Sequence, residues 1–146
     1  MLGRTRPWRT RVREVLLISK RGRVLFQHSK VAFRWTDEYA RRFLEVVHIA
    51  KTSFRHEPGL GRVERPEHPV EFFEFGNYRL YPIEGDRVFL VVVIEGKLQP
   101  DERAFLLKTV TNLETQYGAA LTDVQDQESI PGLDAELVQS LGLGKP

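Results

Sequence analysis

The order of its patterned segments constrains this chain more than any other feature of its sequence. An apolar hairpin comes first, a helical stretch follows, three more strands come next, and helices occupy the rest. The predicted segments are the hairpin 14–29, the helix 37–54, the strands 70–75, 78–82 and 87–95, and helices from residue 100 onward. Strands joined by short turns pair as antiparallel neighbours. The sequence therefore predicts an α+β fold: a five-stranded antiparallel sheet in the order strand, strand, helix, three strands, helix, helix.

The turns and the central strand have clear local signals. Gly22 supplies the left-handed position for the turn of the first hairpin. Gly76 and Gly85 mark the turns between the three later strands. Residues 88–94 are apolar and mostly β-branched, which is typical of a strand covered on both faces. We therefore predict that the strand 87–95 lies in the centre of the sheet.

The helix 37–54 is predicted from its N-terminal cap and its apolar spacing. Thr36 is a favourable cap, and Asp37 and Glu38 place negative charge in the first turn, where the helix dipole favours it. Apolar residues then recur three and four apart, which predicts one face lying on the sheet. These residues are Tyr39, Phe43, Val46 or Val47, Ala50 and Phe54. The opposite face is predicted to be solvated and carries Arg41, Arg42, Glu45 and Lys51.

The remaining segments are a loop and two helices. Residues 57–69 are rich in glycine, proline and charge, and we expect a surface loop there. Pro100 favours the first turn of a long helix. Its predicted core stripe is Phe105, Leu106, Val110, Leu113 and Tyr117. We expect Phe105 to face Val91 between this helix and the sheet, and a last helix to begin near Asp134.

Composition narrows the class of protein. With 146 residues and 41% hydrophobic content, the chain is long enough for one domain with its own core. It has no cysteine, which excludes disulfides, thiolate metal sites and cysteine nucleophiles. The longest apolar run, residues 88–94, is too short to span a bilayer, and no signal-like stretch precedes residue 14. We expect a cytoplasmic protein with a single domain over residues 14–146.

The first 13 residues differ from the rest in charge. They contain five arginines and no acidic residue. We interpret residues 1–13 as a basic arm whose candidate anion-binding residues are Arg4, Arg6, Arg9 and Arg11. Such an arm can bind nucleic acid or an anionic membrane surface. The alternative is a solvated leader without a ligand, in which case removing residues up to Arg11 has little effect on stability.

No residue pattern points to catalysis. The serines lack the Gly-x-Ser-x-Gly setting of a hydrolase nucleophile. The glycines at 59 and 61 lack the lysine and the strand-to-helix context of a phosphate loop. No two of the histidines have the compact spacing of a zinc motif; they are His28, His48, His56 and His68. We therefore expect a protein without enzymatic activity, with no catalytic residue, metal ligand or cofactor.

Cations and an aromatic ring gather around the start of the first predicted helix. Arg34 and Trp35 stand just before it, and Arg41 and Arg42 stand on its solvated face. Aromatic rings beside cations are typical of nucleic-acid surfaces, and exposed arginines also complement acidic protein faces. These four are the candidate partner-binding residues. The alternative for Trp35 is a structural role in which it closes the end of the sheet core.

Two stretches resemble longin and roadblock domains. The hairpin with the apolar residues 15–18 and the turn at Gly22 is similar to the first hairpin of longin domains generally. Residues 70–81, followed by the Gly85 turn and residues 88–94, resemble the middle of the small (sigma) subunits of clathrin-type adaptor complexes. The resemblance covers about residues 14–121. With its additional arginine arm, the chain looks like a prokaryotic, archaeal longin-like protein.

That resemblance implies a longin-like or profilin-like fold and a non-enzymatic interaction module. Members of this group scaffold trafficking and signalling complexes, pair through sheet edges and helices, and bind Ras-like small GTPases. The expected partners are a small GTPase or another longin or roadblock protein, in a homo- or heterodimer formed through strand 24–29 or the first helix. Peripheral membrane association stays open. One alternative is a nucleic-acid-associated protein that uses the basic arm, and a second is a small-ligand sensor of the PAS or GAF type.

Overall fold

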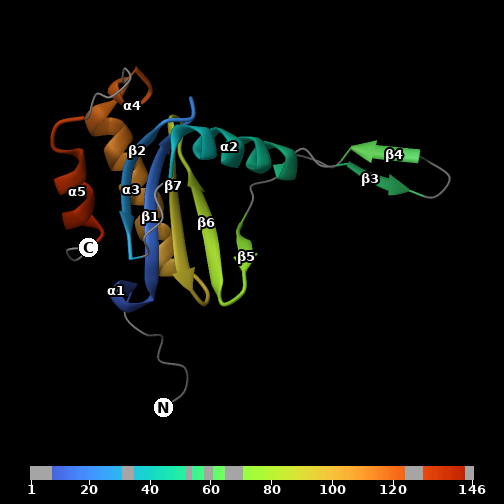
Figure 1. The fold of residues 1–146 in the computed structure, drawn as a ribbon, viewed down its shortest axis with the longest axis horizontal. Coiled ribbons are helices and arrows are strands. Elements are labelled where there is room, and N and C mark those ends of the chain that lie inside the picture. Colours follow the sequence, from blue (N-terminus) through green and yellow to red (C-terminus); the bar gives the residue numbers. More distant parts are fainter. Residues whose placement is uncertain are drawn as a thin grey trace, which may run out of the picture.

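The computed structural model describes residues 8–30, 35–51, 54–57, 61–64, 71–123 and 130–143 (Figure 1). The helices are α1 (Trp8–Arg11), α2 (Asp37–Lys51), α3 (Pro100–Tyr117), α4 (Ala120–Asp123) and α5 (Leu133–Ser140). The strands are β1 (Val12–Ser19), β2 (Val24–Ser29), β3 (Phe54–Glu57), β4 (Gly61–Glu64), β5 (Phe73–Phe75), β6 (Tyr78–Glu84) and β7 (Val88–Glu95).

Five of these strands form one antiparallel sheet. Its order is β2-β1-β7-β6-β5, so β7 lies in the centre and β2 and β5 lie at the edges. The predicted α+β class, the five-stranded antiparallel sheet and the central position of the last strand are confirmed. The observed chain order adds α1, the separate β3–β4 pair and α4 to the predicted series of elements.

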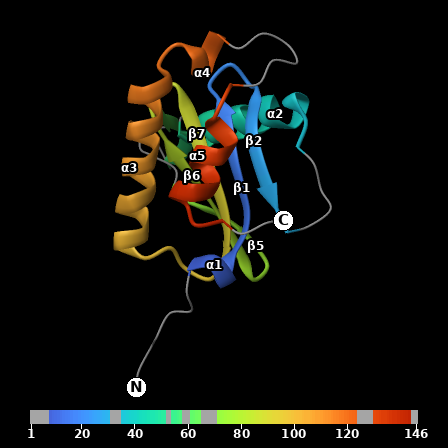
Figure 2. The same cartoon turned by 90° about the vertical axis from the view of Figure 1, so that its left-hand side faces the viewer.

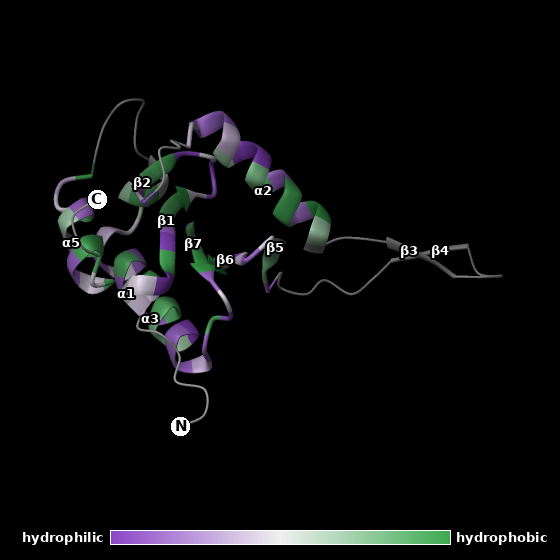
Figure 3. Cartoon of the chain, turned by 60° about the horizontal axis from the view of Figure 1, so that its bottom comes forward, coloured by the Kyte–Doolittle hydropathy of each residue, from purple (hydrophilic) through white to green (hydrophobic). Residues whose placement is uncertain are grey.

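Both faces of the sheet are covered. Successive side chains of a strand point to opposite faces, so Val15 and Leu17 of β1 join one core cluster while Leu16 and Ile18 join the other. Helices α1, α3 and α5 cover the first face, called here the α3 face, and α2 covers the second, the α2 face (Figures 2 and 3). This double coverage explains why β1 and β7 are continuously apolar.

On the α3 face, the predicted helix is present and its predicted core stripe is confirmed except at Phe105. Leu106, Val110 and Leu113 are buried against the sheet, whereas the Phe105 side chain is 48% exposed. Val91 belongs to the core of the opposite face, so the expected contact between Phe105 and Val91 is wrong. Adjacent residues of a helix are separated by about 100° around its axis, so Leu106 and Phe105 cannot both face the sheet.

On the α2 face, the predicted cap is confirmed and the buried stripe is shifted. The hydroxyl of Thr36 accepts the N–H of Tyr39 at 3.2 Å. The buried residues are Ala40, Phe43 and Val47, whereas Tyr39 is 49% exposed and the expectation for it is wrong. The helix ends at Lys51, and Phe54 starts β3 instead of extending the helix.

The expected loop 57–69 contains a strand that the sequence patterns did not show. β3 pairs with β4 in antiparallel register, with Phe54 opposite Glu64 and Glu57 opposite Gly61. Each strand has only four residues, which is too short for an apolar alternation to stand out. Residues 58–60 and 65–69 of the expected loop lie outside the described residues.

The second half of the expected basic arm is part of the domain. The Trp8 indole N–H donates to the carbonyl of Leu141 at 3.0 Å, and β1 already starts at Val12. Arg11 is 3% exposed, and its guanidinium donates to the Glu102 carboxylate at 2.7 and 2.9 Å and to the Lys97 carbonyl. The expectation of a solvated arm is therefore wrong for residues 8–13, because a tertiary ion pair and an indole hydrogen bond attach them to α3 and α5. Residues 1–7 lie outside the described part of the chain.

Candidate functional site

An apolar hollow lies between α2 and the β5–β6 side of the sheet. Its volume is about 270 Å³, and we call it the α2 groove. The groove contains Trp35 and Arg42, two of the four residues predicted to bind a partner. The residues that line it are Trp35, Tyr39, Arg42, Phe43, Val46, Phe73 and Leu80. Arg42 is the only charged side chain in this described lining, so the groove can accept an apolar side chain from another molecule.

The aromatic wall of the groove follows from the packing of Phe43. The ring of Phe43 contacts Trp35 edge to face, with ring centroids 5.8 Å apart. It contacts Phe73 of β5 in the same manner at 6.3 Å and Phe89 of β7 at 6.4 Å. Aromatic pairs favour this edge-to-face arrangement. Phe43 therefore joins α2 to the sheet and holds the groove walls in position.

Polar contacts fix Trp35 at the start of α2. Its backbone N–H donates to the side-chain oxygen of Gln27 at 3.0 Å, and the Gln27 amide donates to the Glu14 carboxylate at 3.1 Å. Burial raises the pKa of Glu14, and hydrogen bonds from Gln27 and Trp35 oppose that rise. Trp35 therefore has the structural role weighed from the sequence, because it packs against the core of the α2 face, and it also lines the groove. Its role in partner binding stays a prediction.

A second apolar stripe on α2 faces outward; its Tyr39 and Val46 line the groove, and its Ile49 lies beyond it. Tyr39, Val46 and Ile49 are 49%, 49% and 65% exposed, although all are large and hydrophobic. With Arg42 they stand at positions i, i+3, i+7 and i+10, which places them on one side of the helix. Arg42 pairs with Glu38 at 3.0 Å, but both side chains are well exposed, so this pair contributes little stability.

This outward stripe was missed from the sequence, although a signal for it exists. One buried stripe accounts for Ala40, Phe43 and Val47, and α2 has further large apolar residues that this stripe cannot include. A helix that covers a sheet with one face needs only that single stripe. The surplus of apolar residues on α2 was thus the available indication of a second, partner-facing side.

The structure separates the other predicted partner-binding residues. Arg41 lies over the β1–β2 turn, where the added methyl group of an alanine at Gly22 would overlap its side chain. It is exposed, one position along α2 from Arg42, but it does not line the groove. Arg34 lies outside the described residues.

Of the four candidate anion-binding residues, Arg11 alone has a described side chain. Arg11 is buried with Glu102 and cannot offer its guanidinium to a phosphate without breaking that pair. Arg4 and Arg6 lie outside the described residues, as does the side chain of Arg9. The described part of the chain therefore supplies no anion site at the N-terminus.

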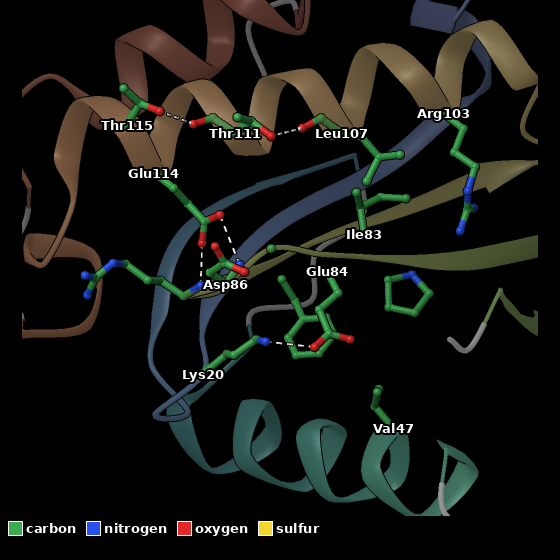
Figure 4. A pocket seen from close by; sticks show the side chains of 14 residues that line it. Lys20, Val47, Ile83, Glu84, Asp86, Arg103, Leu107, Thr111, Glu114 and Thr115 are labelled. Carbon is green, nitrogen blue, oxygen red and sulfur yellow. Dashed lines mark hydrogen bonds and ion pairs between the residues drawn. The ribbon is translucent and has the colours of Figure 1, made fainter. Parts of the chain in front are cut away.

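A larger and more polar hollow, the α2–α3 cleft, lies beyond the end of β5. β5 pairs only with Tyr78–Leu80 of β6, so the second half of β6, including Pro82, borders this cleft. Its volume is about 820 Å³, and Val47 of α2 and one side of α3 form its walls (Figure 4). Proline has no N–H to offer to a neighbouring strand and is typical of such edge positions. The sequence analysis did not identify this cleft, because it exists only where two helices and a strand end meet.

The acidic groups at one end of the cleft already have structural partners. The Glu114 carboxylate of α3 accepts the backbone N–H groups of Asp86, at 3.0 Å, and Arg87 in the β6–β7 turn (Figure 4). Glu84 pairs with Lys20 at 2.7 Å. These contacts tie the turn to α3 and hold that end of the cleft closed.

A third hollow follows the edge strand β2. It measures about 690 Å³ and is lined by β2, the start of α2 and Asp134 of α5. The predicted exposed edge at residues 24–29 is thus present, and β2 is an edge strand. Burial lowers the pKa of His28 in this strand, and the charge of Lys30 lowers it further.

The described residues offer neither a metal site nor a membrane-spanning helix. No group of three histidine, cysteine, aspartate or glutamate side chains in that part of the chain is arranged to hold a metal ion. None of the helices that the structure describes is long and apolar enough to cross a membrane. Comparisons with models of known protein families and with curated proteins find no match for this chain.

Proposed function

We propose that this chain is a non-enzymatic protein-interaction module that binds a partner protein through the α2 groove and the adjacent stripe on α2. The observation that supports this most is the pairing of an apolar hollow with exposed Tyr39, Val46 and Ile49 on the same helix. Large apolar side chains grouped on a surface mark interaction sites, because their burial by a partner is favourable. Aromatic residues and arginine, both present in the groove, are also the types most enriched at the centres of interfaces.

The proposed partner is a Ras-like small GTPase, with a second longin or roadblock protein as the other member of the same class. This choice is based on the sequence resemblance to longin and roadblock domains, and an analogy of fold is a weaker basis than a site. The exposed side chains of Arg41 and Arg42 add a physical reason, since they complement an acidic partner face. The module then acts as a scaffold in trafficking or signalling and pairs through β2 or α2.

A direct binding experiment tests this proposal. The full chain is titrated against a panel of small GTPases, each loaded with GDP or with a non-hydrolysable GTP analogue, and the heat of binding is measured. We expect binding to one nucleotide state, with a loss of about tenfold or more in the Val46→Glu/Ile49→Glu variant, because each carboxylate would be desolvated in the interface. Phe105→Glu is the matched control, since Phe105 is 48% exposed and lines none of the three hollows.

Two results would reject the proposal. Unchanged affinity in the Val46→Glu/Ile49→Glu variant would place the interface elsewhere on the molecule. Equal binding to duplex DNA, RNA and every GTPase, all lost at moderate salt, would indicate non-specific attraction through the basic N-terminus. Charge reversal at Arg41 and Arg42 separates these cases, because it should weaken a GTPase complex without lowering the melting temperature.

A further inference from the structure

The α2–α3 cleft contains a guanidinium group for which the described part of the chain supplies no counter-ion. Arg103 is half-buried on α3, and its side chain points into the cleft (Figure 4). Among the residues that the structure describes, no side chain or carbonyl forms a hydrogen bond or ion pair with this guanidinium. A partly desolvated charge is costly unless it is paired. Arg103 is therefore prepared for an anionic group from outside the chain.

The nearest acidic side chains do not neutralise Arg103. Glu102, its neighbour in sequence, binds Arg11 on another side of α3. Glu114 lies eleven residues further along α3, which corresponds to roughly 16 Å along the axis. Figure 4 shows Glu114 at the far end of the cleft, with its carboxylate turned to the β6–β7 turn. The Arg103 end is consequently positive and the opposite end is occupied by structural contacts.

The side chain next to Arg103 on the cleft side of α3 is apolar. Leu107, one turn along α3, is 44% exposed and lines the cleft, and Pro82 and Ile83 of β6, which also line it, are buried. The next wall residues are Thr111 and Thr115, whose hydroxyls donate to the carbonyls of Leu107 at 3.0 Å and Thr111 at 2.9 Å. Their donor capacity is thus used inside the helix. This wall offers contact area for an apolar body and few hydrogen-bond donors.

We propose that the α2–α3 cleft binds a small amphipathic carboxylate, such as a fatty or aromatic acid. Its carboxylate forms a bidentate pair with Arg103, and its apolar body lies on Leu107 above Pro82 and Ile83. The planar guanidinium matches a carboxylate in this geometry. The cleft volume of about 820 Å³ is within the range of small-molecule sites. This site is separate from the α2 groove and does not depend on the proposed partner.

A titration followed by amide NMR tests the site, with octanoate, octanol and octylamine as probes added to the full chain. We expect saturable octanoate shifts at Ile83, Leu107 and Thr111, and weaker binding of octanol and octylamine. Arg103→Gln should lower octanoate affinity about tenfold, because it removes a charge-assisted pair, and leave octanol affinity unchanged. Lys108→Gln is the matched control, since Lys108 is exposed on α3 outside the cleft, and it should bind octanoate normally.

Several outcomes would overturn the assignment. Equal binding of octylamine, unchanged octanoate affinity in Arg103→Gln, or no saturation below the micelle concentration would each reject it. Shifts centred on Trp35 and Tyr39 would move the site to the α2 groove. Binding of a capped peptide with glutamate beside leucine, dependent on Arg103 and without octanoate binding, would replace the small molecule by a peptide. The Val46→Glu variant should retain octanoate binding, so failure of the GTPase proposal leaves this test unaffected.

Discussion

Helices cover the two faces of the sheet to different extents. On the α3 face, helices from both ends of the chain bury a large apolar cluster, and Trp8, Arg11 and Glu114 attach each helix to its neighbours by hydrogen bonds. On the α2 face, one helix covers a smaller core built around Phe43, and large apolar residues stay exposed on its outer side. The comparison shows that the α3 face buries the larger core, whereas the α2 face keeps large apolar side chains uncovered, which is where the proposed binding surface lies.

The largest expected loss of stability is on the α3 face. Leu106→Ala should lower the free energy of unfolding by roughly 2–5 kcal/mol, because Leu106 is 1% exposed and its loss leaves a cavity. Phe105→Ala, one residue earlier, should cost about 1 kcal/mol or less, since its ring is half exposed. Urea denaturation followed by circular dichroism measures both. Equal costs would show that α3 is rotated relative to the arrangement described.

The next largest loss of stability is expected when the ion pair between Arg11 and Glu102 is broken. Arg11→Met should cost about 2–4 kcal/mol, because it leaves the Glu102 carboxylate beside the core without its partner. The control is Arg13→Met, which breaks the more exposed pair with Glu95 at 3.2 Å and should cost about 1 kcal/mol or less. Urea denaturation followed by circular dichroism measures both losses of stability. If Arg11→Met lowered the free energy of unfolding as little as Arg13→Met, residues 8–11 would not be part of the packed α3 face.

The contact between α3 and the β6–β7 turn should have an intermediate effect. An alanine at Gly85 would place its methyl carbon 2.5 Å from both Glu114 Oε1 and Val110 Cγ1. Relieving this overlap should cost roughly 1–3 kcal/mol. Asp86→Ala is the neighbouring control and should be nearly neutral, since the Asp86 side chain is exposed. A thermal melt that is unchanged in Gly85→Ala would mean that the turn moves freely away from α3.

The pH dependence of stability tests the burial of Glu14 on the α2 face. Its pKa in the folded protein is raised above the ordinary value of 4.5 by burial, so the folded state holds the proton more tightly than the unfolded state. The contribution of Glu14 to stability is therefore fully present below pH 4.5 and is lost over the interval in which the pH rises through the raised pKa.

The Glu14→Gln variant removes this titration and keeps an oxygen that can accept from Gln27. Its unfolding free energy, relative to the unmodified protein, should rise with pH in that interval and level off above the raised pKa. Denaturant titrations at several pH values measure the difference. A constant difference between the two proteins would show that the Glu14 carboxylate is as well solvated in the folded state as in the unfolded state.

The smallest effect is expected on the outward stripe of α2. Val46→Ser and Ile49→Ser should each change stability by about 0.5 kcal/mol or less, because both side chains are largely exposed. Combined with lost partner binding, this would separate the binding surface from the folding core. A large loss of stability in either variant would show that the stripe is covered within the domain.

Much of the fold was predictable because its signals are local. The glycine turns, the cap at Thr36, the proline at the start of α3 and the apolar run of β7 each depend on a few neighbouring residues, and each was placed correctly. The candidate site was predicted in part. Trp35 and Arg42 do line the groove, but Arg41 does not, since one residue along a helix changes the side on which a residue lies. Of the exposed apolar residues of α2, Tyr39 was assigned to the core, Val46 was one of two alternatives with Val47, and Ile49 was not assigned.

The sequence by itself determined the order of the five sheet strands and the main helices along the chain and the turns between the strands, because backbone preference and apolar period act over short distances. The tertiary structure decided which face each helix presents, that Arg11 is buried with Glu102, and that α2 and α3 leave a cleft around Arg103. These features depend on contacts between residues far apart in the chain, such as Arg11 and Glu102, which are 91 positions apart. Burial is a property of the assembled layers, so a spacing pattern within one segment does not contain it.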